Sequence, residues 1–211
     1  MGVRPGASRL RWCRTMAKAG QTGGLEGIAG AAKAASGKGL PPIDLWNPPY
    51  CGEIDMRIAA DGTWFYKGTP IERPALVRLF ASVLKREGDH YFLVTPVEKC
   101  GIAVDDAPFM AVELKIVRAG ATRRLSFRTN VDDWVECGHD HPLRFEPEVG
   151  TGGLKPYLLV RRNLWAKVTR ALFYDLVNLG EERAVAGAPM FGVACAGEFF
   201  PMTIVERDIA R

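Results

Sequence analysis

The sequence predicts an α+β protein made of two small units that share the order strand, strand, helix, strand. Several short runs alternate apolar and polar residues, which is typical of half-buried strands. Two longer runs place apolar residues about 3.6 positions apart and predict helices. These elements occur twice in the same order. Because the residues of the two copies align poorly, the repeat is one of topology.

The length and composition allow two small domains with real cores. The chain has 211 residues, and 47% of them are hydrophobic. We expect a disordered N-terminal extension at 1–22, because it has too little apolar surface to offset the entropy of ordering. An N-terminal α+β domain with a short leading helix follows at 23–99. A β-rich C-terminal domain with one long helix is expected at 100–205.

The N-terminal segment accounts for the net positive charge of the chain. Residues 1–39 hold seven lysines or arginines and one acid, Glu26, so the remaining chain is slightly acidic. Proteins that bind nucleic acid usually cluster basic residues on the folded domain, so no nucleic-acid partner is expected. No apolar stretch reaches the roughly 20 residues of a membrane helix, so no membrane span is expected.

The cysteines and the first residues indicate a cytoplasmic protein. Five scattered cysteines without a CxxC pair do not form a disulfide framework, and no secretory signal is present. The arginine-rich, acid-poor start has two interpretations, an organelle transit peptide or a gene start placed upstream of the true one. The sequence from Met16 favours the second.

Short alternating runs bounded by Gly, Pro and Asp predict the strands. In the first unit they are 54–59, 63–67 and 91–95, with a turn at Gly62. In the second unit a long hairpin runs from Ile102 to Asn130 around Gly120, followed by strands at 134–138, 142–147, 156–162 and 190–195 and an extended tail at 197–202.

Two amphipathic helices are predicted, besides a short docking helix at 23–35. The first spans about 71–86, with Thr69 as its N-cap in a capping box and Gly88 as its stop. The second spans 163–179, with Asn163 as its N-cap and Gly180 after it.

Residues along the whole body resemble one bacterial family. The stretches are "LPPIDLWNPPYCGEIDMRIAADGTWFYKGTPIERPALVRLF", "YFLVTPVEK", "VDDAPF", "FRTNVDD", "HPLRFE" and "YLLVRRNL…ALFYDLV". In this order they resemble domain-of-unknown-function family 1285 over about residues 23–202. The resemblance implies a duplicated-domain fold whose second domain is superficially like a pleckstrin-homology fold. It also implies a nucleotide-like ligand at the domain interface and a link to signalling, without an established enzymatic activity.

The stretch "WVECGHDHP" raises the question of a metal. Cys137, His139 and His141 alternate along it, and a loop could turn all three to one side. A structural zinc site needs about four converging ligands, usually from two elements, and the sequence offers no second cluster. Only "HPLR" fits the family pattern. We therefore expect a strand-connecting loop and predict neither a metal site nor a cofactor.

Charged residues at strand ends and turns are the candidates for ligand binding. Arginine matches phosphate through its planar fork, and acids in turns can bind cations or accept hydrogen bonds. The predicted binding residues, in a cleft between the units, are Arg57, Glu98, Asp105, Asp106, Asn130 and Arg161. The alternative is that the acids form turns and that the strand arginines pair with neighbouring acids.

Three functions remain open from the sequence. The first is a ligand-binding or sensing module for a small anionic, nucleotide-like molecule. The second is a protein–protein interaction scaffold without a small ligand. The third is a metal-assisted hydrolase built on the acid pairs at 105–106 and 132–133. No GxxxxGK[ST], GxGxxG or GxSxG motif is present, and we assign no catalytic residue.

Overall fold

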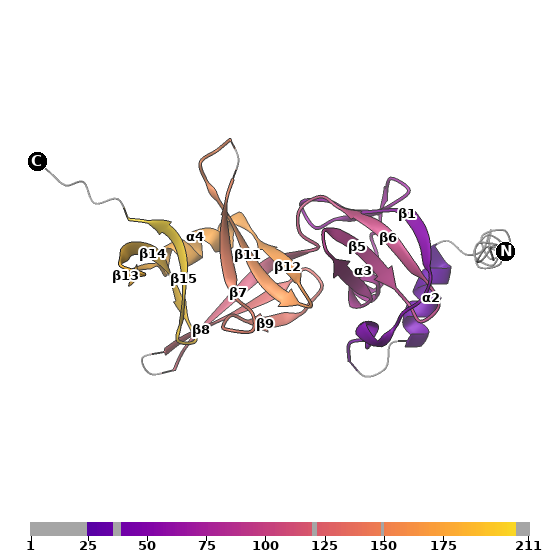
Figure 1. Cartoon of the computed structure of the whole chain (residues 1–211), viewed down its shortest axis with the longest axis horizontal. Coiled ribbons are helices and arrows are strands. Elements are labelled where there is room, and N and C mark those ends of the chain that lie inside the picture. Colours follow the sequence, from indigo (N-terminus) through magenta and orange to yellow (C-terminus); the bar gives the residue numbers. More distant parts are fainter. Residues whose placement is uncertain (1–24, 36–38, 120–121, 149, 206–211) are drawn as a thin grey trace, which may run out of the picture. The chain divides into compact units, whose positions relative to one another are not determined.

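The computed structural model describes residues 25–35, 39–119, 122–148 and 150–205 (Figure 1). The predicted extension at 1–22 lies outside these residues. The chain forms two compact units. One contains the chain up to Arg57 together with Thr63–Ala103, and the other contains Ile58–Gly62 together with the chain from Val104. Both consist largely of β-sheet, and the described residues contain three α-helices.

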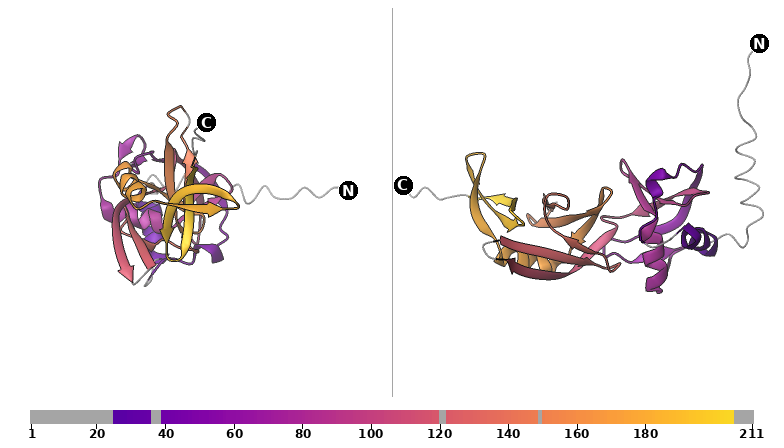
Figure 2. Two further views of the ribbon diagram at one scale, coloured as in Figure 1. Left: turned by 90° about the vertical axis from the view of Figure 1, so that its left-hand side faces the viewer. Right: turned by 90° about the horizontal axis from the view of Figure 1, so that it is seen from below.

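The first unit is built on one six-stranded sheet in the order β3-β2-β1-β6-β5-β4. Helix α2 contacts α3 beside this sheet (Figures 1 and 2). The elements are α2 (Leu25–Ala35), the 3-10 turn η1 (Ile43–Leu45), β1 (Tyr50–Ile58), β2 (Trp64–Tyr66), β3 (Thr69–Pro70), α3 (Pro74–Ser82), β4 (Leu84–Glu87), β5 (His90–Val94) and β6 (Lys99–Val104).

The core of the first unit lies between its sheet and α3. The ring of Trp64 on β2 stacks on Phe80 of α3 with 6.3 Å between centroids, and both side chains are fully buried. On α2, Ile28 and Ala32 are buried, four residues apart on one helical face. The contact between α2 and α3 therefore rests on the small apolar face that the sequence predicted for the leading helix.

The first predicted helix is shorter than expected at both ends. Thr69 is not its N-cap but lies in β3, and the N-cap is Arg73. Pro74 begins the helix because proline fits the first helical position, where its missing N–H costs nothing. At the other end, residues 84–87 leave the helix for β4 because Leu84 pairs with Leu93 of β5 and is buried there.

The second unit contains two sheets and α4 (Figure 1). The larger sheet has the order β10-β11-β12-β7-β8-β9, in which only the β12–β7 pair is parallel. The elements are β7 (Phe109–Ala119), β8 (Thr122–Thr129), β9 (Trp134–Glu136), β10 (Leu143–Pro147), β11 (Leu154–Arg161), β12 (Leu164–Val168), α4 (Arg170–Asn178), β13 (Glu181–Val185), β14 (Ala188–Cys195) and β15 (Glu198–Ile204). The last three form the smaller antiparallel sheet.

One face of the larger sheet forms the core of the second unit. Successive strands place Leu143, Leu158, Ala166 and Phe109 opposite one another, and all four are buried. Helix α4 contributes Leu172 and Leu176 to the buried residues, and its Phe173 meets Phe145 of β10 at 6.3 Å between ring centroids. Because side chains alternate along a strand, the other face carries Arg144, Tyr157 and Lys167.

The second predicted helix begins seven residues later than expected. Arg162 and Asn163 have φ angles of 44° and 61°, the signature of a two-residue hairpin turn, so Asn163 joins β11 to β12 and does not cap a helix. Leu164, Ala166 and Val168 are buried in alternation, which is the period of a strand. Thr169 is the N-cap of α4, which covers only Arg170–Asn178.

The predicted hairpin from Ile102 also divides. Strand β6 ends at Val104 in the first sheet, and β7 begins at Phe109 in the second. Between them lies "DDAP", in which the aspartates favour a turn and Pro108 cannot donate to a ladder. The long β7–β8 hairpin agrees with the prediction, although Gly120 at its tip lies outside the described residues.

Candidate functional site

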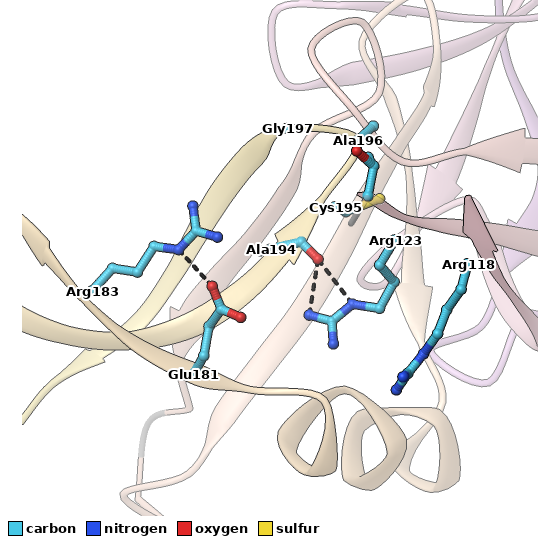
Figure 3. A pocket seen from close by; sticks show the side chains of 9 residues that line it. Arg118, Arg123, Glu181, Arg183, Ala194, Cys195, Ala196 and Gly197 are labelled. Carbon is cyan, nitrogen blue, oxygen red and sulfur yellow. Dashed lines mark hydrogen bonds and ion pairs between the residues drawn. The ribbon is translucent and has the colours of Figure 1, made fainter. Parts of the chain in front are cut away.

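A polar pocket of about 360 Å³ lies in the second unit (Figure 3). Strands β7 and β8 form one wall, and the sheet of β13, β14 and β15 forms the other. Three arginines and one glutamate line it. The lining residues are Arg118, Thr122, Arg123, Glu181, Arg183, Ala194, Cys195, Ala196 and Gly197. We refer to this site as the arginine pocket.

Arg123 is fixed in place by the β14 backbone. Its Nε and Nη2 atoms both donate to the carbonyl oxygen of Ala194, at 3.1 and 2.9 Å. In return, the backbone N–H of Ala196 donates to the carbonyl of Arg123 at 2.8 Å. Strand β8 and the end of β14 are thus hydrogen-bonded to each other in both directions. The side chain of Arg123 is pre-organised at the wall of the pocket, which lowers the entropy cost of binding a ligand there.

Arg118 faces Arg123 without a counter-ion. The two residues are direct partners in the antiparallel β7–β8 ladder. Arg118 is exposed, and within the described part of the chain its side chain makes no hydrogen bond or ion pair. Figure 3 shows both guanidinium groups on the same side of the hairpin. Like charges opposite each other destabilise a ladder, so this pair leaves positive charge for an incoming anion.

The third arginine is partly neutralised. The Nε of Arg183 forms an ion pair with Glu181, two residues earlier on β13 (Figure 3). Its guanidinium carbon also lies 5.3 Å from the centre of the Phe199 ring. Since one carboxylate faces three guanidinium groups, the lining remains net positive. Arginine keeps its charge in proteins, so this field persists at every physiological pH.

A pair of thiols lies behind the pocket wall. Cys195 ends β14, lines the pocket and is 1% exposed, while Cys137 follows β9 and is fully buried. The Cys195 thiol donates to the carbonyl of Cys137 at 3.1 Å. A hydrogen bond between the two thiols raises the pKa of Cys137, together with burial, and lowers the pKa of Cys195. The two thiols therefore interact directly behind the pocket wall.

The arrangement is suited to holding an oxyanion. The guanidinium of Arg118, and the donors of Arg123 that Ala194 does not occupy, can donate to phosphate or carboxylate oxygens, and such charge-assisted bonds are about twice as strong as neutral ones. The volume is at the lower end of the range for small-molecule sites, roughly 300–1,000 Å³. The pocket therefore fits a compact anion or the phosphorylated end of a larger molecule.

Two residues predicted from the sequence lie in the first unit. The guanidinium carbon of Arg57 lies 5.0 Å from the centre of the Phe65 ring. Burial raises the pKa of Glu98, and its carboxylate lies 4.0 Å from the Cys100 sulfur. The backbone N–H of Glu98 donates to Thr95 Oγ1 at 3.2 Å.

The predicted acid pair at 105–106 has structural contacts in the second unit. Asp106 accepts hydrogen bonds from Tyr157 and Lys167, both at 2.7 Å, and Lys155 lies 4.0 Å away. Burial opposes ionisation of Asp106, but these bonds outweigh it and hold its pKa below the usual value. The neighbouring Asp105 donates its backbone N–H to the carbonyl of Ile58 at 3.0 Å.

Asn130 and Arg161 also make contacts within the protein. Asn130 accepts from the N–H of Met110 at 3.0 Å and donates to the carbonyl of Gly62 at 3.3 Å. Arg161 pairs with Asp133, and its guanidinium lies 4.8 Å from the centre of the Phe109 ring. Asp106, Asn130 and Arg161 thus bind three different sets of partners, each of which stabilises the second unit.

The acid pair at 132–133 and the stretch "WVECGHDHP" also make structural contacts. Asp132 pairs with Arg128 at 3.1 Å, as Asp133 does with Arg161. The Nδ1 atom of His141 lies 3.1 Å from the carbonyl oxygen of Leu159, and Cys137 faces Cys195. Over the described ranges no three His, Cys, Asp or Glu side chains gather as a metal would require.

None of the binding residues predicted from the sequence lines the arginine pocket. The one available signal was "RAGATRR", whose arginines the β7–β8 register places opposite each other at Arg118 and Arg123. The approach of β13 and β14, which brings Glu181, Arg183 and Ala194, joins segments about 60 to 70 residues apart. No local sequence pattern predicts such a long-range contact.

Comparisons with known proteins agree on one family. Residues 41–107 match the N-terminal domain of DUF1285, a domain of unknown function, and residues 108–202 match the C-terminal domain, described as a protein of unknown function. A crystal structure of a DUF1285 family protein from Silicibacter pomeroyi DSS-3 is similar at 49% identity, with a TM-score of 0.76 over 84% of this chain and 95% of that one.

A second solved structure, a DUF1285 family protein from Shewanella baltica OS155, shares 33% identity over 59% of this chain and 91% of its own, with a TM-score of 0.47. No curated protein gave a match. The resemblance drawn from the sequence is thus confirmed. In the described part of the chain, every helix is too short or too polar to cross a bilayer.

Proposed function

This chain belongs to the DUF1285 family, and we propose that it is a ligand-binding or sensing module for a small anionic molecule. One observation carries the proposal, the unneutralised pair of Arg118 and Arg123 in the arginine pocket. A fold that needed only stability would gain by replacing one member of this pair, because facing like charges weaken a ladder. A bound anion would turn the same pair into a favourable clamp.

The ligand class follows from the lining. The pocket offers guanidinium donors and few apolar surfaces, so it favours phosphate or carboxylate groups over an apolar molecule. Its volume accommodates a diphosphate or the phosphates of a nucleotide whose base lies outside. The nucleotide-like ligand and the link to signalling remain parts of this proposal, as do the cytoplasmic location and the pleckstrin-like character of the second unit.

The six residues predicted from the sequence remain candidates for ligand contacts within their own units. Arg57 and Glu98 belong to the first unit, and the other four belong to the second. Their present contacts favour structural roles for Asp106, Asn130 and Arg161. The same contacts argue against a metal-assisted hydrolase, because lysines and arginines already occupy the carboxylates that would bind the metal.

One feature favours the alternative of a protein-interaction scaffold. In the first unit a groove of about 970 Å³ runs between α2, α3 and β3, with an apolar lining that includes Leu25, Ala29, Ile71, Leu76 and Leu79. Grooves of this kind accept an amphipathic helix. A scaffold would use this groove and leave the arginine pocket empty, so the two functions predict different sites.

The proposal is tested by thermal unfolding against a panel of small molecules. The panel contains inorganic phosphate, diphosphate, nucleoside mono-, di- and triphosphates, dicarboxylates and uncharged nucleosides. A ligand at 100 times its Kd stabilises the native state by about 2.7 kcal/mol, which raises Tm by roughly 5 °C or more for a chain of this length. We expect phosphorylated members to raise Tm and nucleosides to leave it unchanged.

A matched pair of variants locates the binding site. Arg118→Gln removes a charge inside the pocket, whereas Arg124→Gln removes one from the same hairpin outside it, where Arg124 lies 3.6 Å from Glu136. The shift should disappear in the first variant and persist in the second. A flat panel, or equal losses in both variants, would contradict the proposed pocket and favour the scaffold.

A further inference from the structure

We propose that Cys137 and Cys195 form a reversible disulfide that changes the anion affinity of the arginine pocket. The bond itself is inferred from the thiol geometry, whereas its effect on affinity rests on the proposed function. Neither cysteine is needed for the anion contacts described above. Both are free thiols in this structure; Cys137 directly follows β9 of the larger sheet, and Cys195 ends β14 of the smaller one.

The two cysteines lie on backbone segments that run close together. The N–H of Cys137 continues the β8–β9 pairing by donating to Leu125 at 2.8 Å, and Cys195 donates its thiol proton to the Cys137 carbonyl at 3.1 Å. At the next position along each segment, a Cβ on Gly138 would lie 3.6 Å from the Cβ of Ala196. Disulfides join residues whose Cβ atoms lie about 3.5–4.5 Å apart, so backbones this close are within bridging range.

The thiols also differ in reactivity. The hydrogen bond from Cys137 favours the thiolate of Cys195, and the nearby positive charge of Arg123 acts in the same direction. Cys137 is the harder of the two to ionise, because burial and its neighbour both raise its pKa. This asymmetry is typical of a thiol pair in which one member attacks an oxidant and the other resolves the product.

The pocket supplies a path for the oxidant. Cys195 is 1% exposed and is one of the residues that line the cavity of about 360 Å³, so an oxidant in the cavity reaches its sulfur by a local opening at the end of β14. One water molecule occupies roughly 30 Å³ of liquid, so a molecule as small as hydrogen peroxide enters such a space easily. Cys137 lies behind Cys195 and is absent from the lining. The first attack is therefore assigned to Cys195.

The reaction proceeds in two balanced steps with a peroxide as oxidant. The Cys195 thiolate attacks one peroxide oxygen, the O–O bond breaks, and hydroxide leaves with a proton as water, which gives a sulfenic acid. The Cys137 sulfur, losing its proton, then attacks the Cys195 sulfur, and the S–O bond breaks to release a second water. Two thiols are oxidised to one disulfide and one peroxide is reduced to two waters. A dithiol reverses the change by exchange.

The bond would act on the pocket through Ala194. Forming it removes the hydrogen bond from Cys195 to the Cys137 carbonyl and draws the end of β14 toward Cys137. Ala194, the next residue, holds both donors of Arg123, so its carbonyl moves with the strand. The guanidinium of Arg123 then shifts relative to that of Arg118, and an anion bound between the two groups loses a contact. We expect oxidation to weaken diphosphate binding at least threefold.

The bond is tested on the full chain by oxidation under native conditions. The chain is treated with hydrogen peroxide, its remaining thiols are alkylated, and tryptic peptides are mapped without reduction. Cleavage after Arg128, Arg144, Arg183 and Arg207 places each cysteine of the pair in its own peptide. We expect these two peptides to be linked and to separate after treatment with dithiothreitol. Free peptides, or links mainly to Cys51 or Cys100, would overturn the proposed bond.

Variants test the order of attack. Cys137→Ser should accumulate a sulfenic acid on Cys195 that dimedone traps, and Cys195→Ser should leave Cys137 unmodified. Cys100→Ser serves as the control, because this buried cysteine lies in the first unit. Trapping on Cys137 in the wild-type chain would contradict the assigned order. Since the peptide map uses the wild-type chain, the proposed bond stays testable if a variant fails to fold.

Diphosphate titrations of the reduced and oxidised chains separate the two proposals. Weaker binding after oxidation, restored by dithiothreitol, supports the regulatory effect. Equal binding by both forms overturns that effect and leaves the proposed function intact. A linked peptide pair in a chain that binds no anion in either form supports the disulfide but refutes the arginine pocket as a binding site.

Discussion

Arg118 lies directly opposite Arg123 in the β7–β8 ladder, and among the described residues its side chain forms no ion pair. Arg123 satisfies two of its donors on Ala194, so its position is fixed whether or not a ligand is present. Arg118 has no such restraint. The pair therefore combines one anchored donor with one adaptable donor, and each should respond differently to substitution.

Arg118→Gln should weaken anion binding without weakening the fold. The substitution removes a repulsion between facing charges, an effect of a few tenths of a kcal/mol. We expect the free energy of unfolding to stay constant or to rise by up to about 0.5 kcal/mol in urea titrations. A loss above about 1 kcal/mol would mean that Arg118 makes a structural contact, and it would remove the main argument for a ligand.

Arg123→Met should weaken both the fold and the binding. The variant keeps much of the apolar stem but loses both donors to the Ala194 carbonyl, and a pair of such bonds contributes about 1–2 kcal/mol. Arg183→Met is the control, because its exposed ion pair with Glu181 contributes at most about 1 kcal/mol. Equal stability of the two variants would contradict the anchoring role of Arg123.

The sequence predicted the two-unit, sheet-rich architecture because strand alternation and helix periodicity are local signals. Both large helices were predicted too long, since the same apolar residues also satisfy a strand pattern. Leu164 and Val168 fall on one face of the predicted helix, yet together with Ala166 they are the alternate, inward-facing residues of β12. Only the turn geometry of Arg162 and Asn163, which depends on pairing with β11, decides between the two.

The candidate site was harder to predict than the fold. The sequence analysis chose residues by chemistry, and three of them, Asp106, Asn130 and Arg161, contact partners distant in the sequence. Nothing local distinguishes an arginine that pairs internally from one that faces a pocket. The difference between Arg161 and Arg118 arises from which strands become neighbours, and pairing between distant strands leaves little trace in a single sequence.

Because of Asp106, the free energy of unfolding of the second unit should fall as the pH becomes acidic. Its folded pKa lies below the ordinary value of 3.8, because Lys167 and Tyr157 donate to the carboxylate. The unfolded chain therefore binds more protons as the pH falls, and the stabilisation present above about pH 4 is lost on further acidification. Asp106→Asn should flatten this slope and lower the unfolding free energy at pH 7 by about 1–2 kcal/mol.

Denaturant titrations between pH 3 and 7 measure that slope. Asp175→Asn is a suitable control, because Asp175 is an exposed residue of α4 in the same unit. An unchanged slope in Asp106→Asn would show that Asp106 does not bind its lysine and tyrosine as described.

Gly62→Ala should destabilise the second unit through two effects. Gly62 has a φ of +84°, and an added Cβ would lie 2.7 Å from Met110 Cγ and 2.8 Å from Asn130 Nδ2. Asn130 cannot easily yield, because it is hydrogen-bonded to Met110 and Gly62 themselves. We expect a loss of about 2–4 kcal/mol, the sum of backbone strain and overpacking.

Gly187→Ala separates these two effects. Gly187 has nearly the same φ, +83°, but a Cβ there meets open space. Its substitution should cost only the backbone strain, about 1 kcal/mol. Similar losses at both positions in thermal or denaturant unfolding would contradict the close packing of Gly62 against Asn130.

Calorimetric titration of the full chain with inorganic diphosphate tests the central claim most directly. The account predicts saturable binding at one site, weakened at least tenfold by Arg118→Gln and unchanged by Arg124→Gln. Absence of saturable heat up to millimolar diphosphate, or the same affinity in Arg118→Gln as in the wild-type chain, would contradict an anion site at the arginine pocket.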